Sequence, residues 1–360
     1  MRRRWLDDET YMALVALCQF LPGPASSQTG FSIGLMRAGY LGGLAAWTGF
    51  TLPSAIALVC LAYGASALTG SIGRGLSHGL TLVAVAIVAQ AVLGMVRALY
   101  PDWRRVSIAI VTALLMLLLG ASPVFQVGVI LFGALAGLWL CGASKPSSTA
   151  PLSVPIAHNI GIASLIAFAL LLIGLPLLQR LTASSALALF DAFYRSGALV
   201  FGGGHVVLPL LREAVVVPGW VSEDSFLAGY GAAQAVPGPL FTFAGYLGAA
   251  AVPQPYRLLG AMLGLLGIFL PGLLILLGTL PFWNALRTRA SAQSAMLGIN
   301  AAVVGLLGSA LYNPVWTGSV KTPRDFGVAL LGFMLLTVWH APPWVVVVIG
   351  AAGGALIGAF

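Results

Sequence analysis

Two Pro-Gly-Pro tripeptides lie inside apolar stretches of this 360-residue chain, and their surroundings match. The first belongs to QFLPGPASSQTGF at residues 19–31, and the second belongs to QAVPGPLFTFAGY at residues 234–246, an offset of 215 residues. The same offset pairs Trp5 with Trp220, so the duplication extends well beyond the tripeptide. The sequence therefore predicts two homologous halves, each built around one such motif.

A Pro-Gly-Pro sequence cannot continue a regular helix. Each proline lacks an amide donor and clashes with the preceding turn, and the residue before a proline is driven out of the helical region. Proline is favoured at the first position of a new helix, so we expect Pro24 and Pro239 each to begin a second half-helix. Ser26, Ser27 and Thr242 then place hydroxyls in or near the first turn. Each break thus presents a helix N-terminus.

The composition places these breaks in a membrane. Hydrophobic residues make up 59% of the chain and charged residues 7%, which leaves too few polar groups to cover a water-soluble globule of this size. Apolar runs long enough to span a bilayer recur along the whole length, and 45 glycines and 21 prolines suit tightly packed, partly broken helices. We predict an all-α, multi-pass transmembrane helical bundle of roughly 10–12 membrane elements.

The net charge of +8 comes from 17 basic and 9 acidic residues, and most of the basic ones lie in short gaps between apolar runs. There they bias topology or contact anionic lipid headgroups. A nucleic-acid partner would require a solvated basic domain, which the sequence lacks. Cys18, Cys60 and Cys141 are far apart and have no metal-ligand spacing, so we assign them to packing and expect no metal and no cofactor.

Residues 142–158 have the proline, serine and threonine content of a linker. The runs on either side of this stretch are apolar and carry the two copies of the motif. We therefore divide the chain into an N-terminal repeat at residues 1–141 and a C-terminal repeat at residues 159–360.

The second half contains a further candidate site in FGGGH, residues 201–205. Consecutive glycines each destabilise a helix by about 1 kcal/mol relative to alanine. Gly202, Gly203 and Gly204 therefore indicate either an unwound, amide-rich patch that lines a pathway or a close helix contact. His205 either takes part in binding or coupling, or is a hydrogen-bonded structural residue. The residues alone leave both pairs of alternatives open.

Charged residues inside membrane segments mark functional sites by default. Asp191, Arg195, Arg212 and Glu213 flank the glycine run. Arg212 and Glu213 lie at the end of an apolar segment, so we assign them to the membrane interface. Arg195 lies further in, and we take it as the better candidate for attracting an anion.

Uncharged polar residues inside apolar runs form another group. Gln28, Gln234 and Asn300 either line a path or bridge helices, and the sequence does not separate the two roles. Glycine pairs with GxxxG spacing indicate close helix packing, namely Gly39 and Gly43, Gly260 and Gly264, and Gly350 and Gly354.

Two related halves with a broken helix at equivalent positions are typical of secondary transporters, whose substrate site lies near the bilayer midplane. Free amides and the aligned dipole at each helix N-terminus favour an anion, so two such ends could hold an oxyanion without a basic residue. The sequence contains no GxxxxGK[ST] phosphate loop. A membrane enzyme would need a convergent His/Asp/Glu cluster that it does not show. We predict transport rather than catalysis.

Four segments together resemble the chromate ion transporter family: ALCQFLPGPASSQ, FTLP, FGGGHVVLPLL and AQAVPGPLFTFAGYLGA. The resemblance covers essentially the whole chain. It implies a multi-pass protein of the bacterial inner membrane that exports chromate by means of the membrane potential or proton gradient. The implied partners are chromate, or sulfate or another oxyanion as the alternative substrate, and membrane lipid. A homodimer is one assembly compatible with this.

The resemblance also assigns the substrate-binding motifs. They comprise Gln19, Pro22, Gly23, Pro24, Ser26, Ser27 and Gln28 in the first half, and Gly202, Gly203, Gly204, His205, Gln234, Pro237, Gly238 and Pro239 in the second. We expect backbone amides at the two helix starts to hold the oxyanion, with hydroxyls in the first turns and with Arg195 and His205 assisting.

One element has no equivalent in the first half. Ahead of the second motif lies the apolar segment with the glycine run, and its counterpart would begin before Met1. Members of the family resembled carry such a segment, with Phe-Gly-Gly, at that place. The sequence therefore predicts either a start of translation upstream or a truncated copy that transports poorly or not at all.

Overall fold

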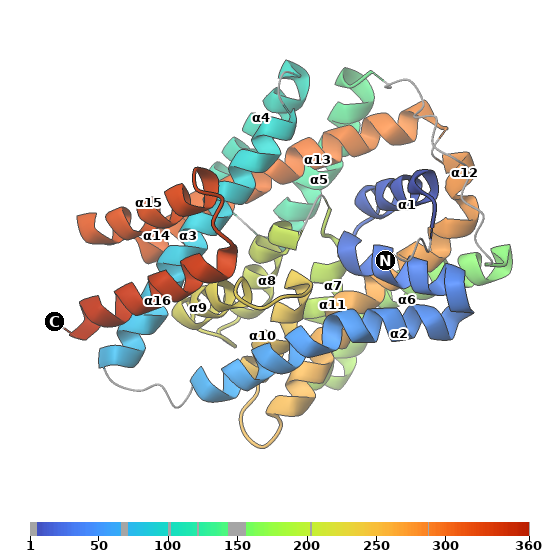
Figure 1. The fold of residues 1–360 in the computed structure, drawn as a ribbon. Coiled ribbons are helices and arrows are strands. Elements are labelled where there is room, and N and C mark those ends of the chain that lie inside the picture. Colours follow the sequence, from blue (N-terminus) through green and yellow to red (C-terminus); the bar gives the residue numbers. More distant parts are fainter. Residues whose placement is uncertain are drawn as a thin grey trace.

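The computed structural model describes residues 6–65, 71–99, 102–120, 122–142, 156–201, 204–286 and 288–359. Regular structure throughout these ranges is helical (Figure 1), as predicted. Residues up to 142 form α1 (Asp8–Phe20), α2 (Ala25–Ala65), α3 (Ser71–Leu99), α4 (Trp103–Leu119) and α5 (Pro123–Leu140).

The later residues begin with α6 (His158–Thr182), α7 (Ser185–Ala198), η1 (Gly204–Val206), α8 (Val207–Val215) and α9 (Glu223–Ala233). They continue with η2 (Leu240–Thr242), α10 (Phe243–Ala251), α11 (Arg257–Thr279), η3 (Leu280–Phe282), α12 (Trp283–Leu286) and α13 (Ala290–Ala310). The last elements are η4 (Leu311–Trp316), α14 (Thr317–Ser319), α15 (Pro323–Thr337) and α16 (Pro343–Ala359).

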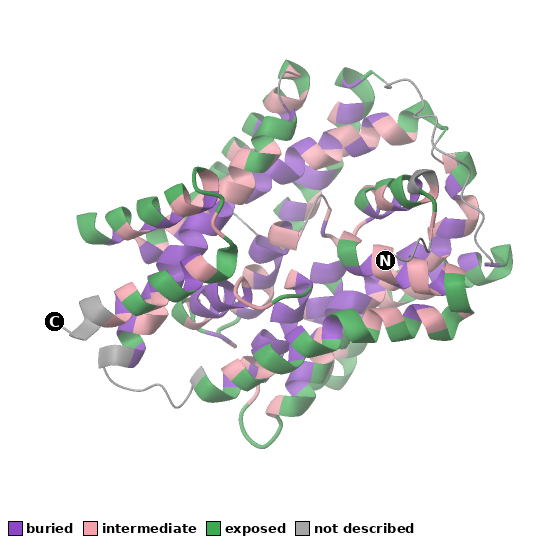
Figure 2. Cartoon of the chain, in the orientation of Figure 1, coloured by how far each residue is buried: buried purple, intermediate pink, exposed green. Residues whose placement is uncertain are grey.

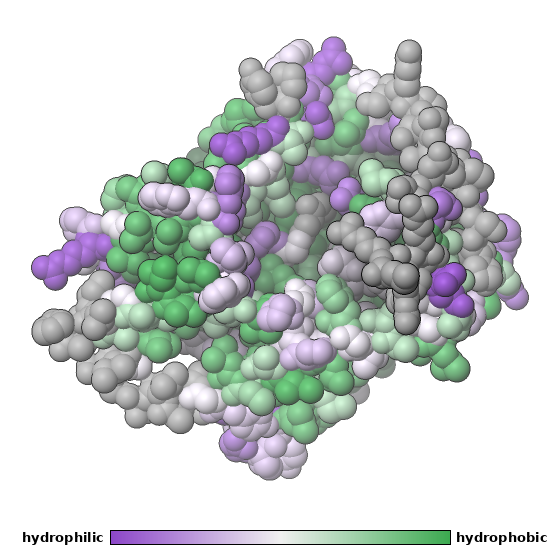
Figure 3. All heavy atoms as spheres, viewed as in Figure 1, coloured by the Kyte–Doolittle hydropathy of each residue, from purple (hydrophilic) through white to green (hydrophobic). Residues whose placement is uncertain are grey.

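Several helices can cross a membrane. Within the described ranges, five stretches are long and apolar enough, namely Ala25–Gly64, Gly73–Leu99, His158–Thr182, Arg257–Leu286 and Ala290–Ser319. Buried positions lie along the inner faces of the bundle (Figure 2), and broad hydrophobic areas cover α16 and α2 on the face in Figure 3. Apolar side chains such as Trp139, which is 93% exposed, cover the outside. This distribution fits a protein surrounded by lipid.

The helix α2 folds back on itself. Ala38 and Gly39 have non-helical dihedral angles, and Gly39 has a φ of +65°. A Cβ on Gly34 would lie 2.3 Å from the carbonyl oxygen of Gly42, so the segments on either side of the break form an antiparallel hairpin. In the second half α10 and α11 pack in the same way.

The helices that follow these hairpins pack across the two halves. α13 packs on α4 and α5, while α3 packs on α15 and α16. Glycines allow both close approaches, because a Cβ on Gly298 would lie 2.0 Å from the Gly133 oxygen and a Cβ on Gly79 would lie 2.1 Å from the Gly350 oxygen. The predicted packing role is confirmed for Gly350 and Gly354, which lie against α3, and for Gly260 and Gly264, which lie against α10. It is wrong for Gly39, which forms the turn of α2 and has no atom within 4 Å of a built Cβ. Helices from each half of the chain therefore pack into a bundle with helices from the other half.

Most of the predicted linker lies outside the described residues, which resume at Ile156. The linker at 142–158 and the repeat boundaries at 1–141 and 159–360 therefore stay predictions.

Candidate functional site

The chain breaks at the first Pro-Gly-Pro motif. α1 ends at Phe20 and α2 begins at Ala25, directly after Pro24. Gly23 has a φ of +114°, a value that favours glycine. Its amide donates a hydrogen bond of 2.8 Å to the carbonyl oxygen of Val200, and Gly23 is buried. The segment that follows α7 therefore covers this break.

The side chain of Gln28 holds the first break against α11. Its Nε2 donates to the carbonyl oxygens of Pro22 and Gly272, both at 2.9 Å. A Cβ on Gly23 would lie 2.9 Å from the Cα of Gly272, so the two backbones are in contact. Gly272 follows Pro271, the proline inside α11. The first break thus lies on the proline-containing helix of the second half.

The second break lies on the first half in the same manner. α9 ends at Ala233, and η2 begins at Leu240. Gly238 has a φ of +151°, and a Cβ there would lie 2.4 Å from the Oγ of Ser54. Ser54 follows Pro53, the proline inside α2. Each motif is therefore paired with the proline-containing helix of the opposite half, which the sequence did not reveal.

One segment touches both breaks. Val200, at the end of α7, accepts the hydrogen bond from the first break. Gly204, at the start of η1, faces the second, since a Cβ on it would lie 3.4 Å from the Cβ of Leu240. Gly202 and Gly203 lie outside the described residues. Before them, Val200 and Phe201 are not helical, and η1 begins directly after them at Gly204. The choice between an unwound patch and a close helix contact stays a prediction.

His205 anchors this segment to the helix before the second break. Its Nδ1 lies 2.6 Å from the hydroxyl of Tyr230, a wholly buried side chain on α9. The hydrogen bond holds the imidazole ring of His205, which belongs to η1, against α9. This contact fits the structural reading of His205 and leaves its part in binding a proposal.

The first turn of α2 offers several groups to a ligand. The first amides of an α-helix have no acceptor within the helix, and the first to bond back is that of Gln28, to Pro24. Ser27 is buried, and neither its hydroxyl nor Oε1 of Gln28 has a partner among the described residues. Ser26 is exposed. Buried polar atoms without partners are costly, so they mark a place where a bound group or water would be stabilised.

The second break is more open. Pro237 and Gly238 are exposed, while Pro239 is buried. The hydroxyl of Thr242 donates to the carbonyl oxygen of Pro239 over 2.8 Å, so it caps the turn. Nε2 of Gln234 is buried and has no partner in the described structure. This amide is the free donor at the second break.

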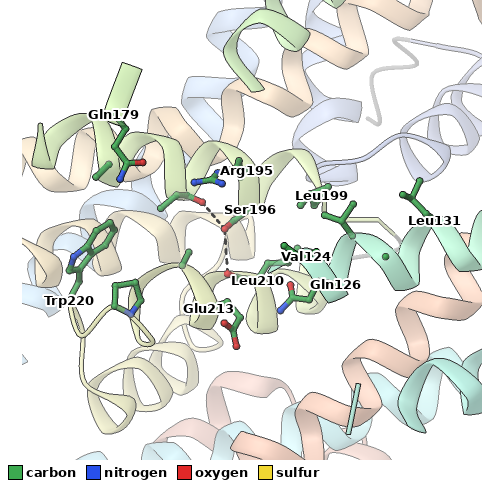
Figure 4. Close-up of a pocket in the computed structure, with 16 residues that line it drawn as sticks. Val124, Gln126, Leu131, Gln179, Arg195, Ser196, Leu199, Leu210, Glu213 and Trp220 are labelled. Atoms are coloured by element: carbon green, nitrogen blue, oxygen red, sulfur yellow. Dashed lines mark hydrogen bonds between the residues drawn. The ribbon is translucent and has the colours of Figure 1, made fainter. Parts of the chain in front are cut away.

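A cavity of about 760 Å³ opens between α5, α6, α7 and α8. Figure 4 shows Arg195 and Ser196 of α7, and Leu199 directly after this helix, on one side of the cavity, with Gln126 of α5 and Glu213 of α8 on the other. The lining reaches Leu199, the residue before Val200. The cavity therefore ends next to the segment that covers Gly23.

Charged groups occupy the wall of this cavity. Arg195 forms an ion pair with Asp191 one turn earlier. Glu213 also lines the cavity with a side chain that is only 11% exposed, although the sequence had assigned it to the membrane interface. Arg212 holds both carboxylate oxygens of Glu223 at 3.0 Å. Arg195 is thus near the predicted site, in the cavity wall, with a carboxylate already bound to it.

Comparison with known proteins bears on this arrangement. The model of the family described as "Chromate transporter" matches residues 1–138 and 187–355. The "Chromate transport protein" of Pseudomonas aeruginosa is 26% identical over 360 residues, which cover 97% of this chain and 83% of that protein. The "Probable chromate transport protein" of Synechococcus elongatus is 27% identical over 98% of this chain and 87% of its own length.

A shorter match covers part of the chain. The "Uncharacterized transporter YwrB" of Bacillus subtilis is 31% identical over 171 residues, 46% of this chain and 83% of that protein. No solved structure matches. The family model spans most of the sequence in two regions, each of which contains one Pro-Gly-Pro break, and the chain belongs to the chromate transporter family.

Proposed function

We propose that this protein exports chromate from the cytoplasm across the bacterial inner membrane, and that the dianion binds where the two breaks meet residues 200–205. The carrying observation is that the chain between α7 and α8 contacts the first break through Val200 and the second through Gly204. Membership of the chromate transporter family supports the substrate.

The groups available at this place suit a tetrahedral dianion. Two helix starts direct amides and the positive ends of their dipoles toward it. The hydroxyl of Ser27 and the Nε2 of Gln234 add neutral donors that lack partners in the described structure. Because these donors are neutral, no charged side chain has to be stripped of water and buried beside the site. The site can therefore bind and release the anion within the membrane interior.

The packing between the halves supports alternating access. Because each break lies on a helix of the opposite half, a displacement of one half against the other moves both breaks at once. The contact between Gly23 and Gly272 couples the first break to α11, and the Gln28 side chain, bonded to the carbonyl oxygens of Pro22 and Gly272, ties the two together. Transporters built from two repeats commonly work by such relative motion.

The membrane potential supplies the driving force in this proposal. Moving one elementary charge across 100 mV is worth roughly 2.3 kcal/mol, and chromate carries two negative charges at neutral pH. Because the electrical potential of the cytoplasm is negative relative to the outside, it favours outward movement of the dianion.

Transport into inside-out vesicles tests the proposal. Vesicles with the protein should accumulate labelled chromate when their lumen is made positive, and much less when the potential is collapsed. Sulfate, which shares the shape and charge, is the competing substrate, and excess sulfate should reduce the uptake. Chromate uptake no greater than in vesicles without the protein would contradict the proposal, and faster uptake of sulfate than of chromate would reassign the substrate.

A further inference from the structure

A buried carboxylate that the substrate site does not use lies behind the cavity wall, at Asp191, one helical turn before the lining residue Arg195. Asp191 has no exposed side-chain surface, and its Oδ2 is bonded to Arg195. Its other oxygen, Oδ1, has no partner within the described ranges. A carboxylate in this position is satisfied on one side only, so a proton on it would be tolerated.

Arg195 reaches into the same cavity. Its side chain is 47% exposed and lines the cavity, and Asp191 is its one ion-pair partner in the part of the chain that the structure describes. A guanidinium carries five donors, of which this pair occupies few. Arg195 can therefore bind a second anion if Asp191 no longer competes for it.

The neighbouring elements add few other charges. α8 contributes Glu213, which lies 3.8 Å from Arg212, and Arg212 is held by Glu223 of α9. Around the cavity, α5 and α6 present the neutral amides of Gln126 and Gln179. The contacts of α11 with α7 are made by glycines and apolar residues, and Tyr194 of α7 donates its hydroxyl to a carbonyl of α6.

The sign of the charge in the cavity then depends on protonation. With all groups ionised, Asp191 and Glu213 outweigh Arg195 by one negative charge, and the Arg212–Glu223 pair adds none. A dianion is repelled by this arrangement. One proton on Asp191 brings the net charge of Asp191, Arg195 and Glu213 to zero, breaks the ion pair and leaves Arg195, which lines the cavity, free to face the anion.

We propose that the cavity is an entry site for the oxyanion, and that Asp191 binds the proton that releases Arg195 to it. A proton from water moves onto Asp191, the ion pair opens, and the guanidinium binds the oxyanion; no bond within the oxyanion changes. The bound anion lies beside Leu199 and can pass to the break covered by Val200. This inference rests on the proposed function and adds to it the binding of one proton together with the oxyanion.

Binding of sulfate to the purified full-length protein tests the inference, because sulfate is not reduced by thiols. In this proposal a bound proton favours anion binding, and a bound anion favours proton binding. The affinity of the wild type for sulfate should therefore fall as the pH rises between about 5.5 and 8.5, a range in which a buried carboxylate can bind and release its proton. By reciprocity, adding sulfate to weakly buffered protein should take up protons from the solution and raise its pH. The absence of proton uptake would overturn the proposal.

Variants separate the two carboxylates. Asp191→Asn should bind sulfate about tenfold more tightly than the wild type at the highest pH, a usual size for coupling between two sites, and should take up no proton. Arg195→Gln should bind weakly at every pH, and Arg180→Gln, an exposed arginine of α6, should match the wild type. If Asp191→Asn keeps the pH dependence of the wild type, the proposal is wrong.

Two results protect the test from ambiguity. If Asp191→Asn does not fold, Glu213→Gln decides, since proton uptake must persist in it when Asp191 is the acceptor and vanish when Glu213 is. Loss of chromate transport in Gly23→Ala together with unchanged pH dependence in Asp191→Asn would keep the proposed function and remove this inference alone.

Discussion

The two Pro-Gly-Pro breaks share a tripeptide and differ in what surrounds them. At the first, Gly23 is buried, its amide is bonded to Val200, and its Cα faces the backbone of Gly272. At the second, Gly238 is exposed and faces the hydroxyl of Ser54. The tripeptide sets where the helix breaks, and the segment packed on it sets whether the break is covered or open.

This difference predicts that Gly23 and Gly238 tolerate an added side chain unequally. Backbone cannot move away from a new Cβ without shifting a helix, whereas a serine hydroxyl can rotate or be removed. Each variant below adds or removes atoms at one break and is compared with its counterpart at the other.

The largest effect is expected for Gly23→Ala. The new Cβ would meet the Cα of Gly272 at 2.9 Å, and a left-handed backbone costs a non-glycine residue roughly 1–2 kcal/mol. Transport should fall by about a hundredfold or more, equivalent to roughly 3 kcal/mol. Gly30→Ala, in α2 directly after the break and with no atom within 4 Å, is the control and should transport normally. Initial rates of chromate uptake measure both, and a fully active Gly23→Ala would contradict the assignment.

A smaller loss, about tenfold, is expected for Gly238→Ala. The close contacts of its Cβ, at 2.4 and 2.6 Å, are both with the side chain of Ser54, so the second substitution Ser54→Gly should restore part of the activity. No such rescue exists for the contact between Gly23→Ala and Gly272, since position 272 is already glycine. Uptake rates of the single and double variants form a double-mutant cycle. Additive effects would show that the two positions are not in contact.

The smallest effects are expected for the polar groups that hold the breaks. Gln28→Leu removes two hydrogen bonds at the first break, and Thr242→Val removes one at the second. With about 1 kcal/mol for each bond, plus the cost of carbonyls left without a donor, the first should lower the unfolding midpoint more. Thermal unfolding in detergent measures this, and the opposite order would show that the first break is not held by Gln28.

Local backbone chemistry made the breaks predictable. Proline and glycine act on their own turn, so the ends of α1 and α9 and the starts of α2 and η2 follow from PGP alone. Composition likewise sufficed for the all-α membrane class.

Contacts between distant segments were beyond the sequence. Nearly every helix face is apolar, so no periodicity indicates that Gly23 lies on Gly272 or that α13 packs on α4 and α5. For the same reason Glu213 was placed at the interface although it lines the cavity. The signal that could have helped was the second Pro-containing helix in each half, whose glycine or serine after proline marks the surface that receives the break.

Crystals soaked in chromate test the central claim most directly, because chromium scatters X-rays anomalously. We predict an anomalous peak between Val200 and Gly204, facing the starts of α2 and η2. A weaker peak beside Arg195 at low pH would fit the entry site as well. A strong peak elsewhere, with none between the two breaks, would contradict the account.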